Sequence, residues 1–273
     1  MELKATRYDV RGEIAVIFLA RPHRRNAWTG RMHSEYRFLL DKANNDRSVG
    51  AIVVSGEGDS FCVGGDSQAL QGHSARGSYD SGVSSDIALP GYGIDERFDA
   101  SFAYHYGLNK PIIAAINGAA AGVGLALAAF ADIRFAVPKA KLTTAHGKLN
   151  LPAEYGLSWV LPRIVGLGRA NDLLLTSRVF LSEEAEKIGF VNQLFSSEQL
   201  LHEAEEYARE LVKNISPDSL RQTRWQIYRD QHDAVARSVE KSEELLESMM
   251  KDEDFREGVR ALVEKRSPRW KVR

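Results

Sequence analysis

The fold is decided by residues 110–124, which read KPIIAAINGAAAGVG. Ile112–Ile116 is a short apolar run of the kind that forms a buried strand in an α/β core. Small residues follow, and we expect a helix from about Gly122. At such a junction the first N–H groups of the helix lack helical partners and the positive end of the helix dipole faces outward, so negative charge can be held there. Close helix packing through Gly and Ala is the alternative explanation.

A similar junction precedes it. Ala51–Ser55 is another buried-strand pattern, and residues 61–66, soon after it, read FCVGGD. The adjacent glycines allow a sharp turn with φ > 0 that points N–H groups outward. Taken alone, the pattern also fits a tight turn in which Asp66 caps a helix. A Rossmann phosphate loop fits poorly, because the glycine spacing at 118–124 is wrong and no strand ending in an acidic residue follows.

The flanking sequence extends this strand–loop–helix rhythm. The runs Leu3–Val10 and Ile14–Ala20 predict a hairpin, and Thr29 can cap a helix through about Asn44. Residues 71–93 are rich in Gly and Ser and predict a long surface loop beside a ligand site. From Ser182 the chain becomes helical, with an apolar stripe beginning at Leu200 and two further helices to Lys265. We therefore expect an α/β core over residues 1–195, which holds the ligand site, and a helical region over residues 196–273.

Composition excludes several classes of function. The formal net charge of -1 over 273 residues gives no broad attraction to nucleic acid or to an anionic membrane, so we expect neither as a partner. The most apolar stretch, Ala114–Ala131, contains Asn117 and three glycines and is not expected to span a membrane. The single cysteine, Cys62, cannot form an intramolecular disulfide or a zinc cluster. We expect no metal site and a cytoplasmic location.

The two glycine segments together are far more specific than either alone. With ADIRFA at 131–136, they resemble in order and spacing the core of the enoyl-CoA hydratase/isomerase (crotonase) family. RPxxxNA at 21–27, GFVN at 189–192 and EGxxALxEKR at 257–266 extend the resemblance over nearly the whole chain. It implies a crotonase-like α/β fold, a spiral of ββα units with a helical C-terminal trimerisation region. It also implies an acyl-CoA substrate, with coenzyme A as part of that substrate and no separate cofactor, and a homotrimer or a dimer of trimers.

The resemblance also implies where an enolate would be stabilised. The two oxyanion-hole donors would be the backbone N–H groups of Val63 and Val123, each worth about 2.7–4 kcal/mol by analogy with other oxyanion holes. Val123 stands where many relatives have Gly, which is compatible with a role for the backbone. The remaining substrate-binding positions implied are Arg24, Arg25, Ala27, Gly64, Gly65, Asp66 and Gly122. Among these the arginines suit the phosphates of CoA, although a solvated turn would also explain them.

The catalytic carboxylates of the family's hydratases are missing. Those enzymes carry one Glu three residues after the second donor and another about twenty residues later, where this chain has Ala126 and His146. Glu154 is the next candidate, because apolar neighbours would desolvate it and raise its pKa. Its position resembles that of the single catalytic acid in peroxisomal-type Δ3,Δ2-enoyl-CoA isomerases. A helix-dipole role for Glu154 and a purely structural role for His146 stay open.

These positions favour a Δ3,Δ2-enoyl-CoA isomerase with Glu154 as its base, since one base can take the proton from C2 and return it at C4. A 2-enoyl-CoA hydratase is an alternative. A thioester or β-diketone hydrolase, in which His146 and Glu154 act as a pair, is another. A non-catalytic acyl-CoA binder that keeps the oxyanion frame is the third.

Overall fold

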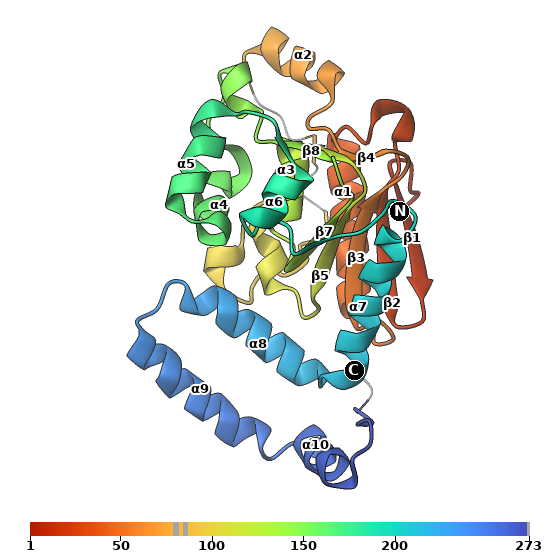
Figure 1. The fold of residues 1–273 in the computed structure, drawn as a ribbon, viewed down its shortest axis with the longest axis vertical. Helices are drawn as coiled ribbons and strands as arrows, with labels where there is room; N and C mark the ends of the chain where they lie inside the picture. Colours follow the sequence, from red (N-terminus) through yellow and green to blue (C-terminus); the bar gives the residue numbers. More distant parts are fainter. Residues whose placement is uncertain (79–81, 84–86, 272–273) are drawn as a thin grey trace.

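The computed structural model describes residues 1–78, 82–83 and 87–271, which form a mixed α/β fold with two sheets (Figure 1). The larger sheet has the strand order β1-β2-β3-β5-β7-β10. Its strands are β1 (Thr6–Arg11), β2 (Ile14–Leu19), β3 (Ala51–Gly56), β5 (Ile112–Ile116), β7 (Ile133–Ala136) and β10 (Gln193–Leu194). The smaller sheet has the order β4-β6-β8-β9, with β4 (Ser60–Cys62), β6 (Ala119–Ala121), β8 (Lys141–Thr143) and β9 (Phe180–Leu181).

The chain passes repeatedly from the larger sheet to the smaller one and then into a helix. β3 and β4 lead to α2 (Ser67–Arg76), β5 and β6 lead to α3 (Val123–Ala129), and β7 and β8 lead through short 3-10 turns to α4 (Leu157–Val165). The strands β2, β3, β5, β7 and β10 are parallel, and only the hairpin β1–β2 is antiparallel in this sheet. This is the spiral of ββα units expected from the sequence.

Helices cover both faces of the larger sheet. Alternate residues of β2 point to opposite sides, so Ala15 and Ile17 join one apolar cluster and Ile14 and Val16 join another. The first cluster includes the apolar face of α1 (Gly30–Asn45), and the second includes the apolar stripe of α7 (Leu200–Asn214). The expected cap of α1 is confirmed, because Thr29 accepts a hydrogen bond from the N–H of Met32 at 3.1 Å.

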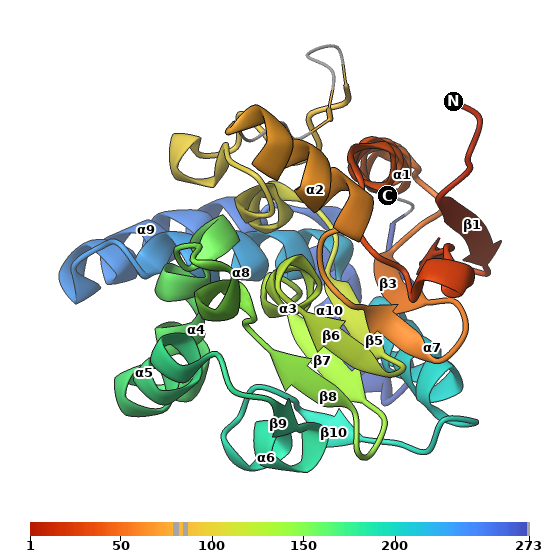
Figure 2. The same cartoon turned by 90° about the horizontal axis from the view of Figure 1, so that it is seen from above.

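The prediction of a loop over residues 71–93 is wrong for its first part. Residues 71–76 belong to α2, which Asp66 caps by accepting a hydrogen bond from the N–H of Gln68 at 2.9 Å. No residue of α2 is buried, which is why the stretch lacks the apolar period that predicts a helix. Figure 1 shows α2 at the top edge of the fold, and in the view from above in Figure 2 it lies in front of the other elements. Residues 79–81 and 84–86 of the predicted loop lie outside the described residues.

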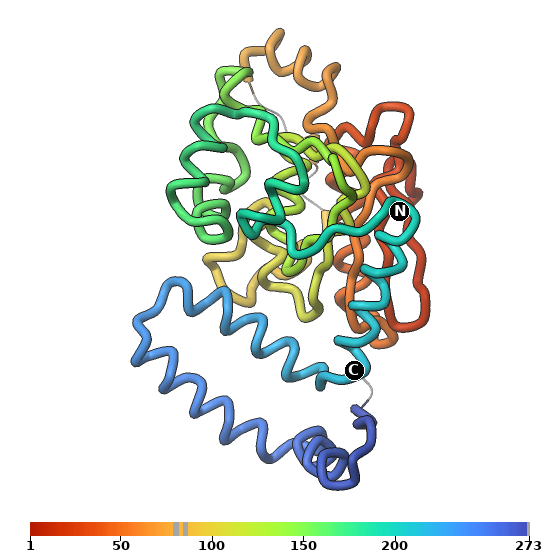
Figure 3. The backbone as a smooth tube through the Cα atoms, viewed as in Figure 1, coloured from red at the N-terminus to blue at the C-terminus, as the bar shows by residue number. Residues whose placement is uncertain are grey.

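The C-terminal part contains one more helix than expected. After α7 come α8 (Pro217–Asp230), α9 (Val235–Met249) and α10 (Glu253–Glu264), where two helices were predicted. No Gly or Pro marks the break between α8 and α9, so the sequence gives no local stop signal there. Figure 3 shows that α8 and α9 run in opposite directions. The chain thereby returns towards the end of α7, where the Trp270 side chain donates to the carbonyl of Lys213 at 3.1 Å.

The helix α8 is anchored to the core by one buried arginine. Arg224 donates from Nε to both carboxylate oxygens of Asp132 at 2.8 and 2.9 Å, and from its other nitrogens to the carbonyls of His105 and Leu108. By contrast, α9 buries no residue and α10 buries Ala261 alone. The described part of the chain contains no helix that is both long and apolar enough to cross a bilayer. The division at residue 195 stays a prediction.

Candidate active site

The two glycine segments meet at one end of the smaller sheet. β4 and β6 are adjacent parallel strands, with Cys62 paired to Ala120, so the residues that follow them emerge at the same edge. Val63 follows β4, and Val123 lies two residues after the end of β6. The backbones approach closely here, because a Cβ atom added to Gly122 would lie 3.9 Å from the Cα of Gly64. The structure therefore brings together the two residues predicted to supply oxyanion donors.

The two backbone donors differ in their surroundings. Val123 is the first residue of α3, and the N–H groups of a first helical turn have no intrahelical acceptor. The N–H of Val63 donates to the carbonyl of Arg25 at 3.3 Å, which is longer than the usual 2.9–3.0 Å. A ligand carbonyl oxygen that accepts from the N–H of Val63 would therefore compete only with the long hydrogen bond to Arg25.

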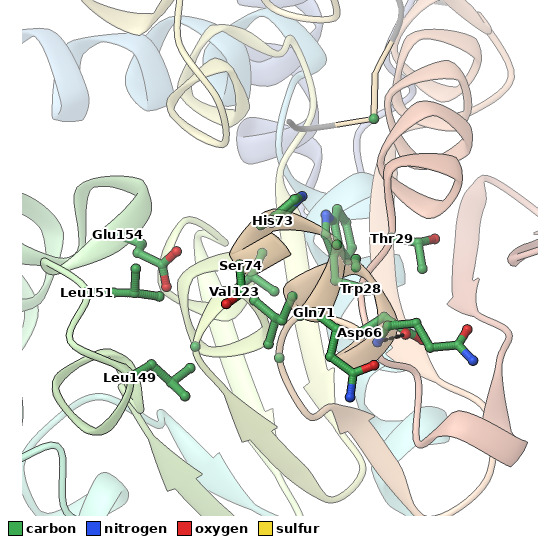
Figure 4. Close-up of a pocket in the computed structure, with 18 of the residues that line it drawn as sticks. Trp28, Thr29, Asp66, Gln71, His73, Ser74, Val123, Leu149, Leu151 and Glu154 are labelled. Carbon is green, nitrogen blue, oxygen red and sulfur yellow. Dashed lines mark hydrogen bonds between the residues drawn. The ribbon is translucent and has the colours of Figure 1, made fainter. Parts of the chain in front are cut away.

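A pocket of about 920 Å³ opens at this edge of the sheet. Figure 4 shows Glu154 and Trp28 on different sides of it, with Val123 between them in this view. The outer wall is α2, including His73 and Arg76. The predicted site residues that line the pocket are Val63, Gly64, Gly65, Asp66, Gly122, Val123, His146 and Glu154. Arg24, Arg25 and Ala27 lie outside its lining.

Asp66 is held as an anion by its neighbours. It forms ion pairs with Arg21 at 3.0 Å and with Arg24 at 3.2 Å, besides capping α2. Burial favours the neutral acid, but the hydrogen bonds from Gln68, Arg21 and Arg24 outweigh it and hold the pKa of Asp66 below its ordinary value. Asp66 is therefore a structural carboxylate. Arg24, predicted to bind CoA, is tied to Asp66, and Arg25 donates to the hydroxyl of Ser60 at 3.4 Å.

Glu154 has the opposite electrostatic character. It begins a 3-10 turn before α4 and is half-buried, and no salt bridge of this side chain occurs within the described part of the molecule. Burial raises the pKa of Glu154 above its ordinary value, while the charge of His146 acts in the other direction. The next residue, Tyr155, has φ of 51°, a left-handed conformation that is uncommon for a bulky side chain. Such strain is often found at functional sites.

His146 lines the pocket but has no orienting partner. Its side chain is 7% exposed, and its Nδ1 atom is buried without a hydrogen-bond partner among the described residues. Its position follows Ala145, whose φ is 60°. A histidine that acts as a general base usually has its second ring nitrogen held by a carboxylate or a carbonyl. That arrangement is not formed here between His146 and Glu154.

Sequence reasoning missed the aromatic part of the pocket. Trp28 and Tyr155 both line it, and both rings contact Phe102, which is fully buried. Trp28 directly follows the RPxxxNA segment, so its proximity to a ligand site could have been inferred from that motif. The sequence did not identify Phe102, because the pocket-lining residues whose rings contact it are distant in the chain.

Comparisons with known proteins agree with this geometry. The sequence model of the enoyl-CoA hydratase/isomerase family matches residues 9–273. The chain is 28% identical to the 1,2-epoxyphenylacetyl-CoA isomerase of Escherichia coli K12, covering 94% of both chains. It is 35% identical to the enoyl-CoA hydratase ACTT3 of Alternaria alternata, covering 94% of this chain and 82% of that one.

A solved structure leads to the same family. The crystal structure of a probable enoyl-CoA hydratase/isomerase from Mycobacterium abscessus superposes with a TM-score of 0.85 at 26% identity, covering 98% of this chain and 99% of that one. A putative enoyl-CoA hydratase from Streptomyces coelicolor A3(2) gives 0.84 at 29% identity, covering 100% and 96%. The folds therefore agree along almost the whole chain. From the match of sequence, fold and site, this chain belongs to the enoyl-CoA hydratase/isomerase family and is an enzyme of the crotonase fold.

Proposed function

We propose that this enzyme is a Δ3,Δ2-enoyl-CoA isomerase that acts on an acyl-CoA thioester, with Glu154 as its single base. One observation carries the proposal. Among the described residues that line the pocket, the acidic ones are Asp66 and Glu154, and Asp66 is held by two arginines. One carboxylate is thus left for proton transfer, and its raised pKa makes its ionised form a stronger base for taking the proton from C2.

The proposed chemistry needs one base and the pair of backbone donors. Removal of a C2 proton moves negative charge onto the thioester oxygen, where the N–H groups of Val63 and Val123 would stabilise it by about 2.7–4 kcal/mol each. Glu154 takes that proton and returns it at C4, so the double bond moves into conjugation with the thioester. No water has to be activated in this cycle.

Hydration of a 2-enoyl-CoA is the less favoured alternative. It requires a water to be held and deprotonated while a proton reaches C2, and Ala126 is a fully buried alanine of α3. We expect hydration to be slower by about 10²–10⁴-fold than with two catalytic groups. Hydration of crotonyl-CoA with kcat above about 10² s⁻¹, well over the enzyme median of about 10 s⁻¹, would show that His146 and Glu154 form a hydratase pair.

Hydrolysis of a thioester or a β-diketone is the second candidate. His146 is near enough for its charge to lower the pKa of Glu154, so the two side chains share one part of the pocket. The unpartnered Nδ1 of His146 weighs against a base–orienter pair. Release of free thiol from acyl-CoA would identify this activity.

The test compares 3-enoyl-CoA and 2-enoyl-CoA as substrates while free thiol and the absorbance of the conjugated thioester are followed. Glu154→Gln should lower isomerisation by about 10²–10⁴-fold and leave acyl-CoA binding intact, since the oxyanion donors are separate from the base. Glu2→Gln, at a side chain 79% exposed, is the matched control. Turnover of Glu154→Gln within about twofold of wild type removes Glu154 from this role. Binding without turnover in the wild-type protein would indicate a non-catalytic acyl-CoA binder.

We also propose a homotrimer or a dimer of trimers in the cytoplasm. The helices α9 and α10 expose apolar side chains, among them Leu246, Leu262 and Val263, that nothing in the described chain covers. A monomer at micromolar concentration in sedimentation would contradict the assembly. The lone Cys62 is compatible with this location, since a fold without intramolecular disulfides does not need an oxidising compartment.

A further inference from the structure

Two aromatic rings form one wall of the pocket, and a third ring from a distant segment packs behind them. Trp28 and Tyr155 line the cavity, and the ring of Phe102 lies behind both of them. The Phe102 ring centroid is 5.6 Å from that of Trp28 and 5.3 Å from that of Tyr155, the latter edge-on at 86°. Phe102 is therefore the contact that joins the two pocket-lining rings.

This wall is fixed from behind. His33 stacks on Phe102 with an angle of 4° between the rings, and Tyr36 meets Trp28 edge-on at 68°. Tyr36 and Phe102 are fully buried. Phe102 also has φ of 63°, an outlier for a bulky residue that persists only where packing determines it. The rings thus have little freedom to rearrange around a ligand.

The position of the wall relates it to the far end of an acyl group. Tyr155 directly follows Glu154 in the chain. If Glu154 serves C2 and C4, as in the proposed function on which this placement rests, the carbons beyond C4 pass next to Tyr155. Trp28 lies across the pocket from Glu154 (Figure 4), so a group that extends from C4 can reach both rings.

We propose that Phe102 is a positioning residue that holds Trp28 and Tyr155 as an aromatic wall, and that this wall selects an aryl group at the distal end of the acyl chain. An aromatic ring has a negative face and a positive edge, so it gains from edge-to-face or offset contact with other rings in a way that a saturated ring cannot. That gain corresponds to a preference of about 2- to 12-fold in affinity.

The test measures binding alone. 5-Phenylpentanoyl-CoA and 5-cyclohexylpentanoyl-CoA have the same number of carbons and similar shapes, and both lack the double bond that isomerisation requires. Calorimetry should show that the wild-type protein binds the phenyl ligand more tightly by about 2- to 12-fold. In Phe102→Leu the ratio should fall to about one. Phe98→Leu is the matched control, because Phe98 is equally buried but its ring contacts Tyr106, outside the pocket lining.

The binding experiment tests the aryl selectivity and the role of Phe102 separately. Equal binding of the two ligands by the wild-type protein would overturn the aryl selectivity. A preference that survives in Phe102→Leu would overturn the positioning role. If Phe102→Leu does not fold, Tyr155→Leu, at a partly buried ring of the same wall, should lose the preference instead. Because the ligands do not react, a loss of the proposed isomerase activity leaves this result standing, and the two failures are distinguishable.

Discussion

Substitution of Gly124 by alanine should separate the two N–H groups that we propose as oxyanion donors. A Cβ atom at Gly124 would lie 2.1 Å from the carbonyl oxygen of Cys62 and 2.8 Å from its Cβ. Cβ atoms do not approach within 3.0 Å, so α3 and β4 would have to move apart by about 0.9 Å at least. Val63 is attached to the strand and Val123 to the helix, and the gap between their N–H groups should widen with that movement.

The expected magnitude follows from this displacement. A misplacement of about 1 Å can lower a rate by about 10²-fold, which corresponds to about 2.7 kcal/mol in the activation barrier. Overpacking of a tight core contact should also lower the free energy of unfolding by about 1–3 kcal/mol. The variant should therefore remain folded but be a much poorer catalyst.

Two assays report on the enolate separately from the product. Exchange of the C2 protons of butyryl-CoA in deuterated water, followed by NMR, needs the donors and Glu154 but no protonation at C4. Both this exchange and the isomerisation kcat should fall by about 10²-fold. Gly168→Ala in α5 (Leu167–Thr176) is the control, because a Cβ there meets nothing within 4 Å. If Gly124→Ala is folded and keeps both rates within about threefold, less than 1 kcal/mol, this placement of the oxyanion hole is wrong.

Charge and packing give four further predictions. kcat/KM should fall as the pH drops through a value above 4.5, because the raised pKa of Glu154 sets where its base form is lost. The raised pKa of Glu154 also stabilises the folded protein below pH 4.5, and this stabilisation is lost as the pH rises through the folded pKa. The free energy of unfolding of Glu154→Gln, measured in urea, should therefore exceed that of wild type at pH 7 but not at pH 4. Asp66→Ala should lower the free energy of unfolding by about 0.5–2 kcal/mol through loss of the α2 cap alone. This loss should shrink as the pH falls through the lowered pKa of Asp66. An unchanged urea midpoint at pH 7 would contradict the capping role of Asp66. Arg224→Met should cost about 3–5 kcal/mol because it leaves the Asp132 carboxylate without its ion-pair partner, whereas Arg221→Met, at a partly exposed side chain, should cost under about 0.5 kcal/mol. Equal losses in thermal unfolding would argue against the anchor.

The predicted parts of the site are those encoded locally. The segments 61–66 and 117–124 each combine a buried strand, small residues and a turn, so the junctions and their backbone donors could be inferred without a structure. The raised pKa of Glu154 could be expected for the same reason, because its apolar neighbours are close in sequence. The family resemblance supplied the order in which these segments come together.

The remaining parts depend on contacts between distant residues. The ring contacts of Phe102 with Trp28 and with Tyr155 join residues that are 74 and 53 positions apart in the chain, and no sequence period reports such contacts. The ion pair between Arg24 and Asp66 was missed in the same way, since an arginine cluster alone does not show which acid it faces. The helix α2 was missed because an apolar period of 3.6 residues marks only helices that bury one face, and α2 buries none.

That lack of a buried face has a consequence for hydrogen exchange. A helix that buries no side chain opens at little cost in free energy, so the amides of α2 should exchange with solvent far faster than those of α3, all of whose residues are buried. Yet α2 forms the outer wall of the pocket, and a bound acyl chain would fill the space beneath it. Saturating the protein with an unreactive acyl-CoA should therefore slow exchange in α2 selectively. The measured affinity would then include the cost of ordering this helix, and a substitution that raises its helix propensity at the solvent face would tighten binding without touching the ligand.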